Sequence, residues 1–440
     1  MSRIADSAMF AHLWGTPELR EVFSERGRLQ GWLEVLAALA RAQSAYGLVP
    51  VAAAQRIGAV TVDELDLDLV AEQTRATGHS TLGLVRGLAE VLPPEVHRHV
   101  YVGASVQDLS DTWTSCALRT VVRVVRRDLL RLEDLLLDLA GRHRDTVMAG
   151  RTHGQPGAPV TFGWKAAGFA DEVHRQLDRL QEGEPRWLVG QLGGGVGTLA
   201  AHGGVGLEVR ARFCAELELG DPGISWLTAR DRIAEVGGVL AMVAGTTARL
   251  GNEVYELQRP EIGELRETPT PGVVGSITMP HKVNPERSEH LDTLARLVRA
   301  GAGVLLEGMT GVHERDGRAW KAEWVALPEV CLLTGRATSL AVELVAGLRV
   351  DVARMRANLT EGTGSEQVLA LLTARFGKHR AQQDLQAALA GGRPLREAVA
   401  LLAERQPDAG LSAAVANLEP DPGLAGAMVD LVVARGRAGR

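Results

Sequence analysis

The fold is decided by residues 233–257, which read IAEVGGVLAMVAGTTARLGNEVYEL. A series of side chains recurs here with alternating spacings of three and four, all apolar except one threonine: Ile233, Val236, Leu240, Val243, Thr247, Leu250, Val254 and Leu257. An average spacing of 3.5 residues keeps such side chains on one stripe of a helix. At 1.5 Å per residue the helix is expected to be roughly 37 Å long. The stretch therefore predicts a long helix that packs along a narrow apolar seam.

Two other segments repeat the pattern, with Leu129, Leu132, Leu136 and Leu139 in one and Leu291, Leu294, Val298 and Leu305 in the other. All three series lie in stretches without proline, a residue that breaks helices: 95–155, 223–259 and 286–327. Aromatic residues make up only 4% of the chain, and runs of period two are rare. Because long helices with narrow seams pack at shallow angles, we expect an all-α fold built on a central bundle.

The helices divide the chain into three predicted domains. Residues 1–104 form an N-terminal helical domain that includes an Ala/Leu-rich helix from Glu21 to Tyr46. Residues 105–350 hold the long helices. Residues 351–440 form a small helical domain, with breaks at Gly391, Gly392, Pro394 and Pro407. Since long helices often project beyond the core of one subunit, we also expect an oligomer.

Composition excludes several classes of function. The formal net charge of −6 argues against a nucleic-acid or anionic-membrane partner. The three cysteines are far apart and odd in number, which favours reduced thiols in a cytoplasmic protein. The N-terminus has no signal-peptide pattern, and no apolar run reaches the roughly 18 residues that span a bilayer. We therefore expect a soluble protein.

Two polar segments between the predicted helices carry candidate site residues. Residues 101–112 read YVGASVQDLSDT and end where a long helix starts, so Ser105, Gln107 and Asp108 either cap that helix or help it bind a carboxylate. Residues 150–156 read GRTHGQP, in which His153 is either structural or a fixed group of a site. The neighbouring Thr152 and Gln155 supply hydrogen bonds that would set the tautomer of His153.

A third segment, GQLGGGVGT at residues 190–198, imitates a dinucleotide-binding fingerprint. No repeating strand–helix pattern surrounds it, so this signal is weak. A mobile or tightly turned glycine loop near a ligand is the better interpretation.

The fourth segment is the most specific: residues 272–285 read GVVGSITMPHKVNP. Its polar side chains crowd a short stretch between two helices: Ser276, Thr278, His281, Lys282 and Asn284. The clustered glycines permit motion of the kind an active-site loop needs. Lys282 and Asn284 lie two apart, so both can contact one carboxylate. A solvated connecting loop is the alternative, but it has no need of Met279-Pro280 beside so many donors.

This segment resembles the signature loop of the fumarase/aspartase superfamily, Gly-Ser-Ser-x-Met-Pro-x-Lys-x-Asn-Pro. The matching residues are Gly275, Ser276, Met279, Pro280, Lys282, Asn284 and Pro285. Segments 101–112 and 150–156 look like the first two conserved regions of that family, in the family's order. The chain looks nearest to adenylosuccinate lyases and 3-carboxy-cis,cis-muconate cycloisomerases. Two segments, 226–232 and 313–324, are similar to the cycloisomerase branch.

The resemblance implies a homotetramer around a twenty-helix core, in which each active site takes its three regions from three different subunits. It also implies a small dicarboxylate-type substrate and no cofactor or metal. Two positions depart from adenylosuccinate lyases, which usually carry His where this chain has Tyr101 and Thr-Ser where it has Ser105-Val106. Both departures weaken the case for a nucleotide substrate. The second Ser of the signature is Ile277 here.

A carbon next to a carboxylate is a very weak acid, so its deprotonation needs groups that stabilise charge in the transition state. By the resemblance, Ser276 is the general base, activated by loop amides and nearby positive charge. Lys282 and Asn284 stabilise the carboxylate, and His153 is the general acid, a task that suits histidine as a residue type. The candidate substrate-binding residues are Tyr101, Ser105, Gln107, Thr152, Gln155 and Arg315; Gly275, Thr278, Met279 and Pro280 shape the loop.

Three functions remain open on the sequence. The first is a lyase that cleaves a C–N bond in a succinyl-type compound and releases fumarate, including a specialised amino- or nitrosuccinate lyase. The second is a 3-carboxy-cis,cis-muconate cycloisomerase, with adenylosuccinate lyase as a further option. The third is a non-catalytic relative like the lens crystallins of the superfamily, which the joint presence of Ser276, His153, Lys282 and Asn284 disfavours.

Overall fold

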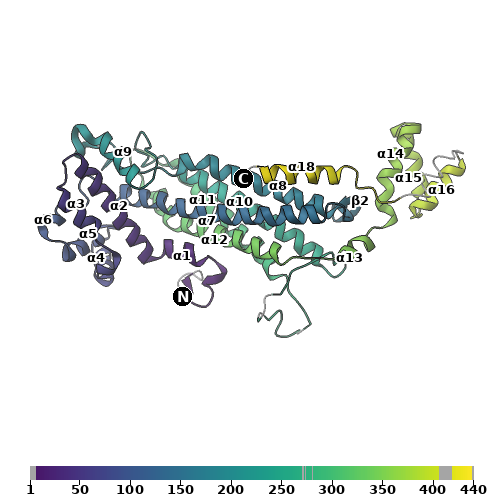
Figure 1. Cartoon of the computed structure of the whole chain (residues 1–440), viewed down its shortest axis with the longest axis horizontal. Coiled ribbons are helices and arrows are strands. Elements are labelled where there is room, and N and C mark those ends of the chain that lie inside the picture. The colour runs from purple at the N-terminus through teal and green to yellow at the C-terminus, as the bar shows by residue number, and fades with distance from the viewer. Residues whose placement is uncertain (1–5, 270–271, 273, 280, 406–418, 439–440) are drawn as a thin grey trace. The chain divides into compact units, whose positions relative to one another are not determined.

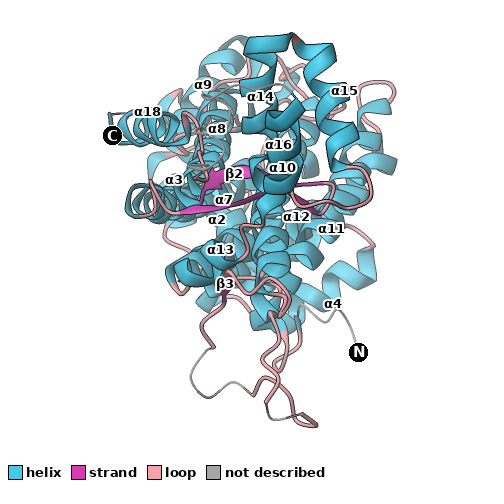
Figure 2. Cartoon of the chain, turned by 90° about the vertical axis from the view of Figure 1, so that its right-hand side faces the viewer, coloured by secondary structure: helices cyan, strands magenta, loops and turns pink. Residues whose placement is uncertain are grey.

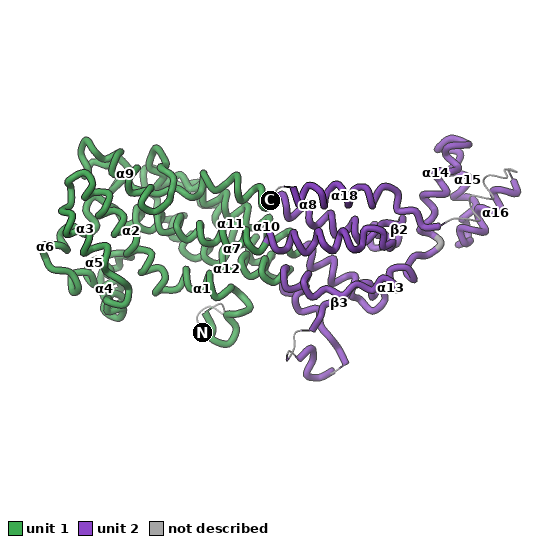
Figure 3. Tube along the Cα trace, in the orientation of Figure 1, with its two compact units in different colours: residues 1–128, 176–248, 291–340 green, residues 129–175, 249–290, 341–440 purple. Residues whose placement is uncertain are grey.

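The computed structural model describes residues 6–269, 272, 274–279, 281–405 and 419–438. Helices make up most of these residues (Figure 2). Their contacts separate into two compact units, which are shown in different colours in Figure 3. Unit 1 comprises residues 1–128, 176–248 and 291–340, and unit 2 comprises residues 129–175, 249–290 and 341–440. The all-α prediction is confirmed, while the predicted three-domain division stays a prediction.

The elements that lie wholly in unit 1 are helices, all of them short except α2 (Figure 1): η2 (Ala11–Leu13), α1 (Pro17–Phe23), α2 (Glu25–Ala45), α3 (Val51–Gly58), η3 (Val62–Glu64), α4 (Leu67–Thr77), α5 (Leu82–Val91), α6 (Pro94–His97), η4 (Ala200–Val205), α9 (Gly206–Glu216) and η5 (Gly308–Thr310). The helix predicted over 21–46 is thus α1 followed by α2, and Ser24 separates the two. Ser24 caps α2 by accepting a hydrogen bond from the amide of Gly27.

Five long helices contribute residues to both units: α7 (Val106–Arg142), α8 (Phe162–Trp187), α10 (Asp231–Gln258), α11 (Glu286–Glu307) and α12 (Gly317–Ala346). Every residue of the three predicted seams is buried, with at most 4% of any of them exposed. The seam prediction is therefore confirmed at each of its positions, Thr247 included.

Small residues allow the helices of unit 1 to approach closely. A Cβ on Gly237 of α10 would lie 2.6 Å from Cδ1 of Leu305 on α11.

Helices α10 and α12 are long and apolar enough to cross a membrane by composition, with a mean hydropathy of 1.3 in their richest windows. In each case 67% of that window is buried inside the protein. This burial is what core helices of a bundle show, so the apolar composition is explained by packing within the fold.

Unit 2 contains the elements that the sequence did not predict, two small antiparallel sheets. Strands β1 (Val147–Thr152) and β2 (Gln155–Thr161) form a hairpin, and β3 (Leu265–Arg266) pairs with β4 (Arg349–Val350). The remaining elements of this unit are helices: α13 (Val352–Ala357), η6 (Glu361–Gly364), α14 (Ser365–Phe376), α15 (Lys378–Leu389), α16 (Leu395–Arg405) and α18 (Ala425–Ala438).

Helices α14, α15 and α16 share a small apolar core of their own, which includes Val368, Leu385 and Val399. The predicted break at Gly391 and Gly392 lies between α15 and α16, and Pro407 lies outside the described residues. Helix α18 has different partners within unit 2. Its Asp430 forms an ion pair with Arg144, which follows the end of α7.

Candidate active site

The N-terminus of α7 is capped by Ser105 and Asp108. The Ser105 amide donates to Asp108 Oδ2 at 2.7 Å, and the Asp108 amide donates to Ser105 Oγ at 3.4 Å. This reciprocal pair is the arrangement of a capping box, with Asp in the position that Glu or Gln usually takes. The capping interpretation of the segment is confirmed, and Ser105 is still half-exposed at the start of the helix.

Asp108 also organises the glycine-rich loop at residues 190–198. The amides of Gly193 and Gly194 each donate to its carboxylate at 2.9 Å, and Gln191 Nε2 donates at 3.0 Å. A Cβ on Gly193 would lie 2.6 Å from Ser225 Oγ and 2.8 Å from the Cα of Gly197, so no larger residue fits without a shift. Of the two expected forms of this loop, mobile or tightly turned, the structure shows the tightly turned one, and its position near a ligand stays a prediction.

Arg315 joins Ser105 and the glycine loop in unit 1. Its Nη2 donates to Ser105 Oγ at 2.7 Å and to the carbonyl oxygen of Gly194 at 3.2 Å. Arg315 Nε is buried and has no hydrogen-bond partner among the described residues. Three predicted features of the sequence, which lie far apart along the chain, therefore form one cationic and hydroxyl-bearing cluster.

Tyr101 lies in a turn just before this cluster. Its φ is 66°, and its hydroxyl is 3.4 Å from the Thr81 hydroxyl. Burial raises the pKa of Tyr101 to about 12. The phenol is therefore protonated at neutral pH and can donate a hydrogen bond.

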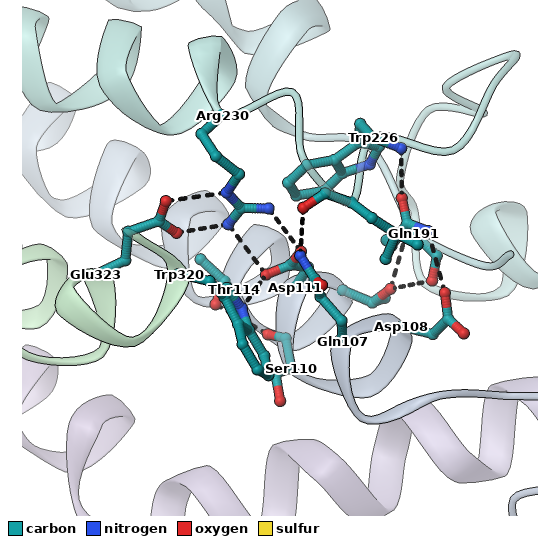
Figure 4. A network of polar contacts seen from close by, with 12 residues as sticks. Gln107, Asp108, Ser110, Asp111, Thr114, Gln191, Trp226, Arg230, Trp320 and Glu323 are labelled. Carbon is teal, nitrogen blue, oxygen red and sulfur yellow. Dashed lines mark hydrogen bonds and ion pairs between the residues drawn. The ribbon is translucent and has the colours of Figure 1, made fainter. Parts of the chain in front are cut away.

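Gln107 is fully buried, in a polar network with Asp111 and Arg230 (Figure 4). Its Nε2 donates to Asp111 Oδ2 at 3.1 Å and to the Leu227 carbonyl oxygen. Arg230 donates to both oxygens of Asp111, at 2.7 and 3.2 Å, and to both oxygens of Glu323. Gln107 is therefore a buried residue of α7 in this structure, and its hydrogen bonds join the first turns of that helix to the backbone at Leu227.

Arg230 is 3% exposed, yet it stays charged because two carboxylates surround it. Burial by itself opposes the charge, but the carboxylates of Asp111 and Glu323 raise the pKa of Arg230 above its ordinary value. Trp320 Nε1 donates to Asp111 at 3.1 Å, and the Arg230 guanidinium lies 5.1 Å from the centre of a Trp226 ring. The network ties α7, α12 and the segment before α10 together within unit 1.

The β1–β2 hairpin of unit 2 presents His153 at its tip. His153 and Gly154 are the two turn residues, with φ of 52° and 75°, between Thr152 and Gln155, which pair. Positive φ at both positions is the geometry of a type I′ turn. A left-handed histidine costs about 1–2 kcal/mol relative to ordinary backbone geometry, and such strain is often found at functional sites. All four residues are exposed.

The signature loop is also in unit 2, between β3 and α11. Ser276 Oγ accepts a hydrogen bond from the Met279 amide at 3.0 Å, and the Asn284 amide group donates to the Gly275 carbonyl oxygen at 3.0 Å. Asn284 also donates to Glu286 at 3.2 Å, so its side chain orders the loop in this structure. Thr278, Met279 and Lys282 are exposed, whereas Pro280 lies outside the described residues.

The structure brings some predicted residues together and leaves others separate. Ser105 contacts Arg315 in unit 1. In unit 2, Ser276 contacts Met279, and Asn284 contacts Gly275. Among the residues that the structure describes, no hydrogen bond or ion pair joins His153 to the signature loop. The described residues also contain no group of three or more His, Cys, Asp or Glu side chains arranged to hold a metal ion.

Sequence reasoning missed Asp111, Arg230 and Glu323. One signal was available, because Asp108 and Asp111 lie three apart and hence on the same face of α7. Two carboxylates on one face of a buried helix need cations or several hydrogen bonds. That requirement predicts a buried arginine, although it does not say which one.

Comparisons with known proteins identify the family of this chain. Residues 14–300 match the family model described as Lyase. The chain is 36% identical to the N-acetyl-S-(2-succino)cysteine lyase of Dickeya dadantii, over 86% of this chain and 84% of that protein. It is 39% identical to the adenylosuccinate lyase of Methanothermobacter thermautotrophicus, over 87% of this chain and 88% of that protein.

A solved structure shows the same fold over almost the whole length. The 3-carboxy-cis,cis-muconate lactonizing enzyme from Pseudomonas putida superposes with a TM-score of 0.88 at 35% identity, covering 98% of this chain and 99% of that chain. The chain therefore belongs to the Lyase family, and it is an enzyme of the fumarase/aspartase superfamily in the branch of adenylosuccinate lyases and 3-carboxy-cis,cis-muconate cycloisomerases.

Proposed function

We propose that this enzyme catalyses a β-elimination from a succinyl-type substrate and releases fumarate, with Ser276 as general base and His153 as general acid. The observation that carries the proposal is the signature loop, in which Ser276 Oγ already accepts a hydrogen bond from the Met279 amide at 3.0 Å. A donated hydrogen bond stabilises negative charge on an oxygen, which is what a serine needs to act as a base.

In the proposed reaction, Ser276 removes a proton from the carbon next to a carboxylate. The electron pair moves onto that carboxylate, where the Lys282 ammonium stabilises the negative charge. Asn284 donates a hydrogen bond to the same carboxylate once its amide group no longer donates to Gly275 or Glu286. The same electron pair then forms the double bond of fumarate as the bond to the leaving group breaks. His153 gives its proton to that leaving group. Thr152, Gln155, Ser105 and Arg315 hold the remaining substrate oxygens.

We propose that the bond to the leaving group is a C–N bond. The relatives include an adenylosuccinate lyase, and the name of the N-acetyl-S-(2-succino)cysteine lyase also indicates a succinyl-type substrate for that protein. A succinyl end is thus the part of the substrate that different members share. The substrate panel should accordingly contain amino-, N-substituted, nitro- and S-substituted succinates.

Absorbance of fumarate during incubation with this panel tests the proposal. Turnover of one member is expected, and Ser276→Ala should lower kcat by about 10²–10⁴-fold, as the loss of a general base does. Ile277→Ser is the matched control, because this neighbour is 93% exposed and should retain turnover. Full activity of the Ser276→Ala variant would exclude the assigned base.

A cycloisomerase is the second candidate. Arg315 lies in the segment that is similar to that branch, and its contact with Ser105 provides a cation for a third carboxylate. The structure of the lactonizing enzyme from Pseudomonas putida is also similar along almost its whole length. Lactone formation from 3-carboxy-cis,cis-muconate, with no fumarate from any succinate, would favour this candidate over the first.

We also propose a homotetramer with active sites shared among three subunits. In unit 1, α11 and α12 expose apolar side chains that a monomer would leave in water: Leu297 (45% exposed), Val304 (40%) and Val325 (56%). They line a groove of about 690 Å³. Exposed apolar patches of this kind mark protein–protein contacts. Light scattering should give four times the chain mass of 47.0 kDa, and a monomer would refute the assembly.

A further inference from the structure

Two buried carboxylates lie three residues apart around strand β3 in unit 2. The side chain of Glu264 is 0% exposed, and Glu267 is 6% exposed. Burying a glutamate carboxylate costs desolvation free energy unless its oxygens accept hydrogen bonds or pair with cations. The partners of the two residues are therefore informative.

Glu267 closes the base of the signature loop. Its Oε1 accepts hydrogen bonds from the amide and the hydroxyl of Ser288, at 3.0 and 2.5 Å, and its Oε2 accepts from the amide of Arg287 at 3.2 Å. Arg287 Nη1 donates to the Thr268 carbonyl oxygen at 2.9 Å. Glu267 and Thr268 precede the loop, whereas Arg287 and Ser288 begin α11. These bonds tie the two ends of the loop to each other.

Glu264 holds the strand that leads to His153. Arg151 donates through Nη2 to Glu264 Oε1 at 2.7 Å and through Nη1 to Oε2 at 2.9 Å. Asn358 Nδ2 adds a bond to Oε1 at 2.8 Å. This fork is the strong, directional form of an arginine–carboxylate pair. Since Arg151 is the residue before Thr152, the fork fixes the strand one position from the turn that presents His153.

We propose that Glu264 and Glu267 are positioning residues, which hold the His153 turn and the base of the Ser276 loop from one short segment of chain. The inference rests on the proposed roles of Ser276 and His153, because a positioning residue acts only through the groups it holds. The charge state matters at both positions, because donors face both oxygens of each carboxylate. An amide of the same shape has one acceptor only and presents its own N–H groups to a donor.

Glu267→Gln tests the loop base without any substrate. Trypsin cleaves after Lys282, which is exposed within the loop. Loosening the loop base should raise the rate of this cleavage in the native protein by about tenfold, as expected for a loss of about 1.4 kcal/mol in local stability. Ser288→Ala removes only the hydroxyl contact and should give a smaller increase. Glu261→Gln is the matched control on the same segment, with a side chain that is 74% exposed.

Kinetics then test the catalytic part. Glu267→Gln and Glu264→Gln should each lower kcat by about tenfold and leave KM within about threefold, since displaced catalytic groups affect the transition state more than binding. Only Glu264→Gln should also shift the basic limb of the kcat–pH profile, which reports the general acid. Arg151→Lys keeps the charge but not the fork, and it should reproduce this shift.

The outcomes separate the inference from the proposed function. Unchanged cleavage at Lys282 in Glu267→Gln overturns the role of Glu267, whatever the enzyme's substrate is. Unchanged kcat in Glu264→Gln and Arg151→Lys overturns the role of Glu264. Faster cleavage after Lys282 in Glu267→Gln, together with no turnover of any succinate by the unmodified enzyme, would support the role of Glu267 and reject the proposed function.

Discussion

Arg315 Nη2 donates a hydrogen bond of 2.7 Å to Ser105 Oγ, and the two residues are 210 positions apart in the sequence. The bond links the loop before α12 to the N-terminus of α7. Arg315 Nε is buried and has no partner among the described residues, so one N–H group of the guanidinium is left unsatisfied. A substrate carboxylate at this place would meet the cation, the hydroxyl and the positive end of a helix.

The first prediction concerns this pair. Arg315→Met removes a charged donor and should lower kcat/KM by about 10–100-fold, the equivalent of about 1.5–3 kcal/mol for a hydrogen bond to a charged group. Ser105→Ala should have a smaller effect in the same direction. Steady-state kinetics on whichever panel member the enzyme turns over measures both. Arg318→Met is the control, since Arg318 is exposed and pairs with Asp316; an equal loss there would reject a specific role for Arg315.

The second prediction concerns the buried Arg230. Arg230→Met leaves Asp111 and Glu323 without their cation and should reduce the free energy of unfolding by about 3–5 kcal/mol, as the loss of one partner of a buried ion pair does. Urea unfolding followed by circular dichroism measures the change. Arg186→Met breaks an exposed pair with Glu235, which water screens, and should cost far less than Arg230→Met. Similar costs for both variants would mean that the buried network contributes no special stability.

The third prediction concerns the glycine-rich loop. Gly193→Ala places a methyl group within 2.8 Å of the Cα of Gly197 and should destabilise the protein by about 1–3 kcal/mol, the range for overpacked sites. The shift also moves the amide that donates to Asp108. In Gly195→Ala the added methyl group has no atom within 4 Å, so thermal unfolding should stay unchanged. Equal melting temperatures for the two variants would contradict the packing argument.

The fourth prediction concerns pH. His202 is 3% exposed, its Nε2 is 3.1 Å from Gln43 Nε2, and burial lowers the pKa of His202. The unfolded chain therefore binds a proton at a higher pH than the folded chain does. The stability that the buried, neutral His202 contributes is complete above the unfolded pKa of about 6.5, and it is lost as the pH falls through the lower folded value.

His202→Gln should consequently reduce the drop in melting temperature between pH 7.5 and pH 5.5. A residual drop is expected, because burial also lowers the pKa of His143. His12→Gln, at an exposed position, should leave the pH dependence as it is. If His202→Gln and the unmodified protein lose the same number of degrees, His202 is not a source of the acid sensitivity.

The sequence by itself determined the long helices and the family signature. The seam from Ile233 to Leu257 is a local pattern, since a residue and its neighbours three and four positions away lie on the same face of a helix. Each of its positions is buried as predicted. The signature at Gly275–Pro285 is equally local, because all of its defining residues lie within eleven consecutive positions. The strands β1 and β2 were missed because the segment around Gly150 and Pro156 reads as a turn rather than as alternating apolar residues.

Only the tertiary structure decided which distant side chains meet. The sequence marks Asp108, Asp111 and Arg230 as polar, but it does not show that Asp108 binds the amides of a glycine loop or that Arg230 neutralises Asp111. The same holds for Glu267, whose partners follow a loop of some twenty residues. The physical reason is that periodicity constrains a residue only relative to its own helix. A hydrogen bond between elements depends on how several helices pack at once, which no single stretch of sequence encodes.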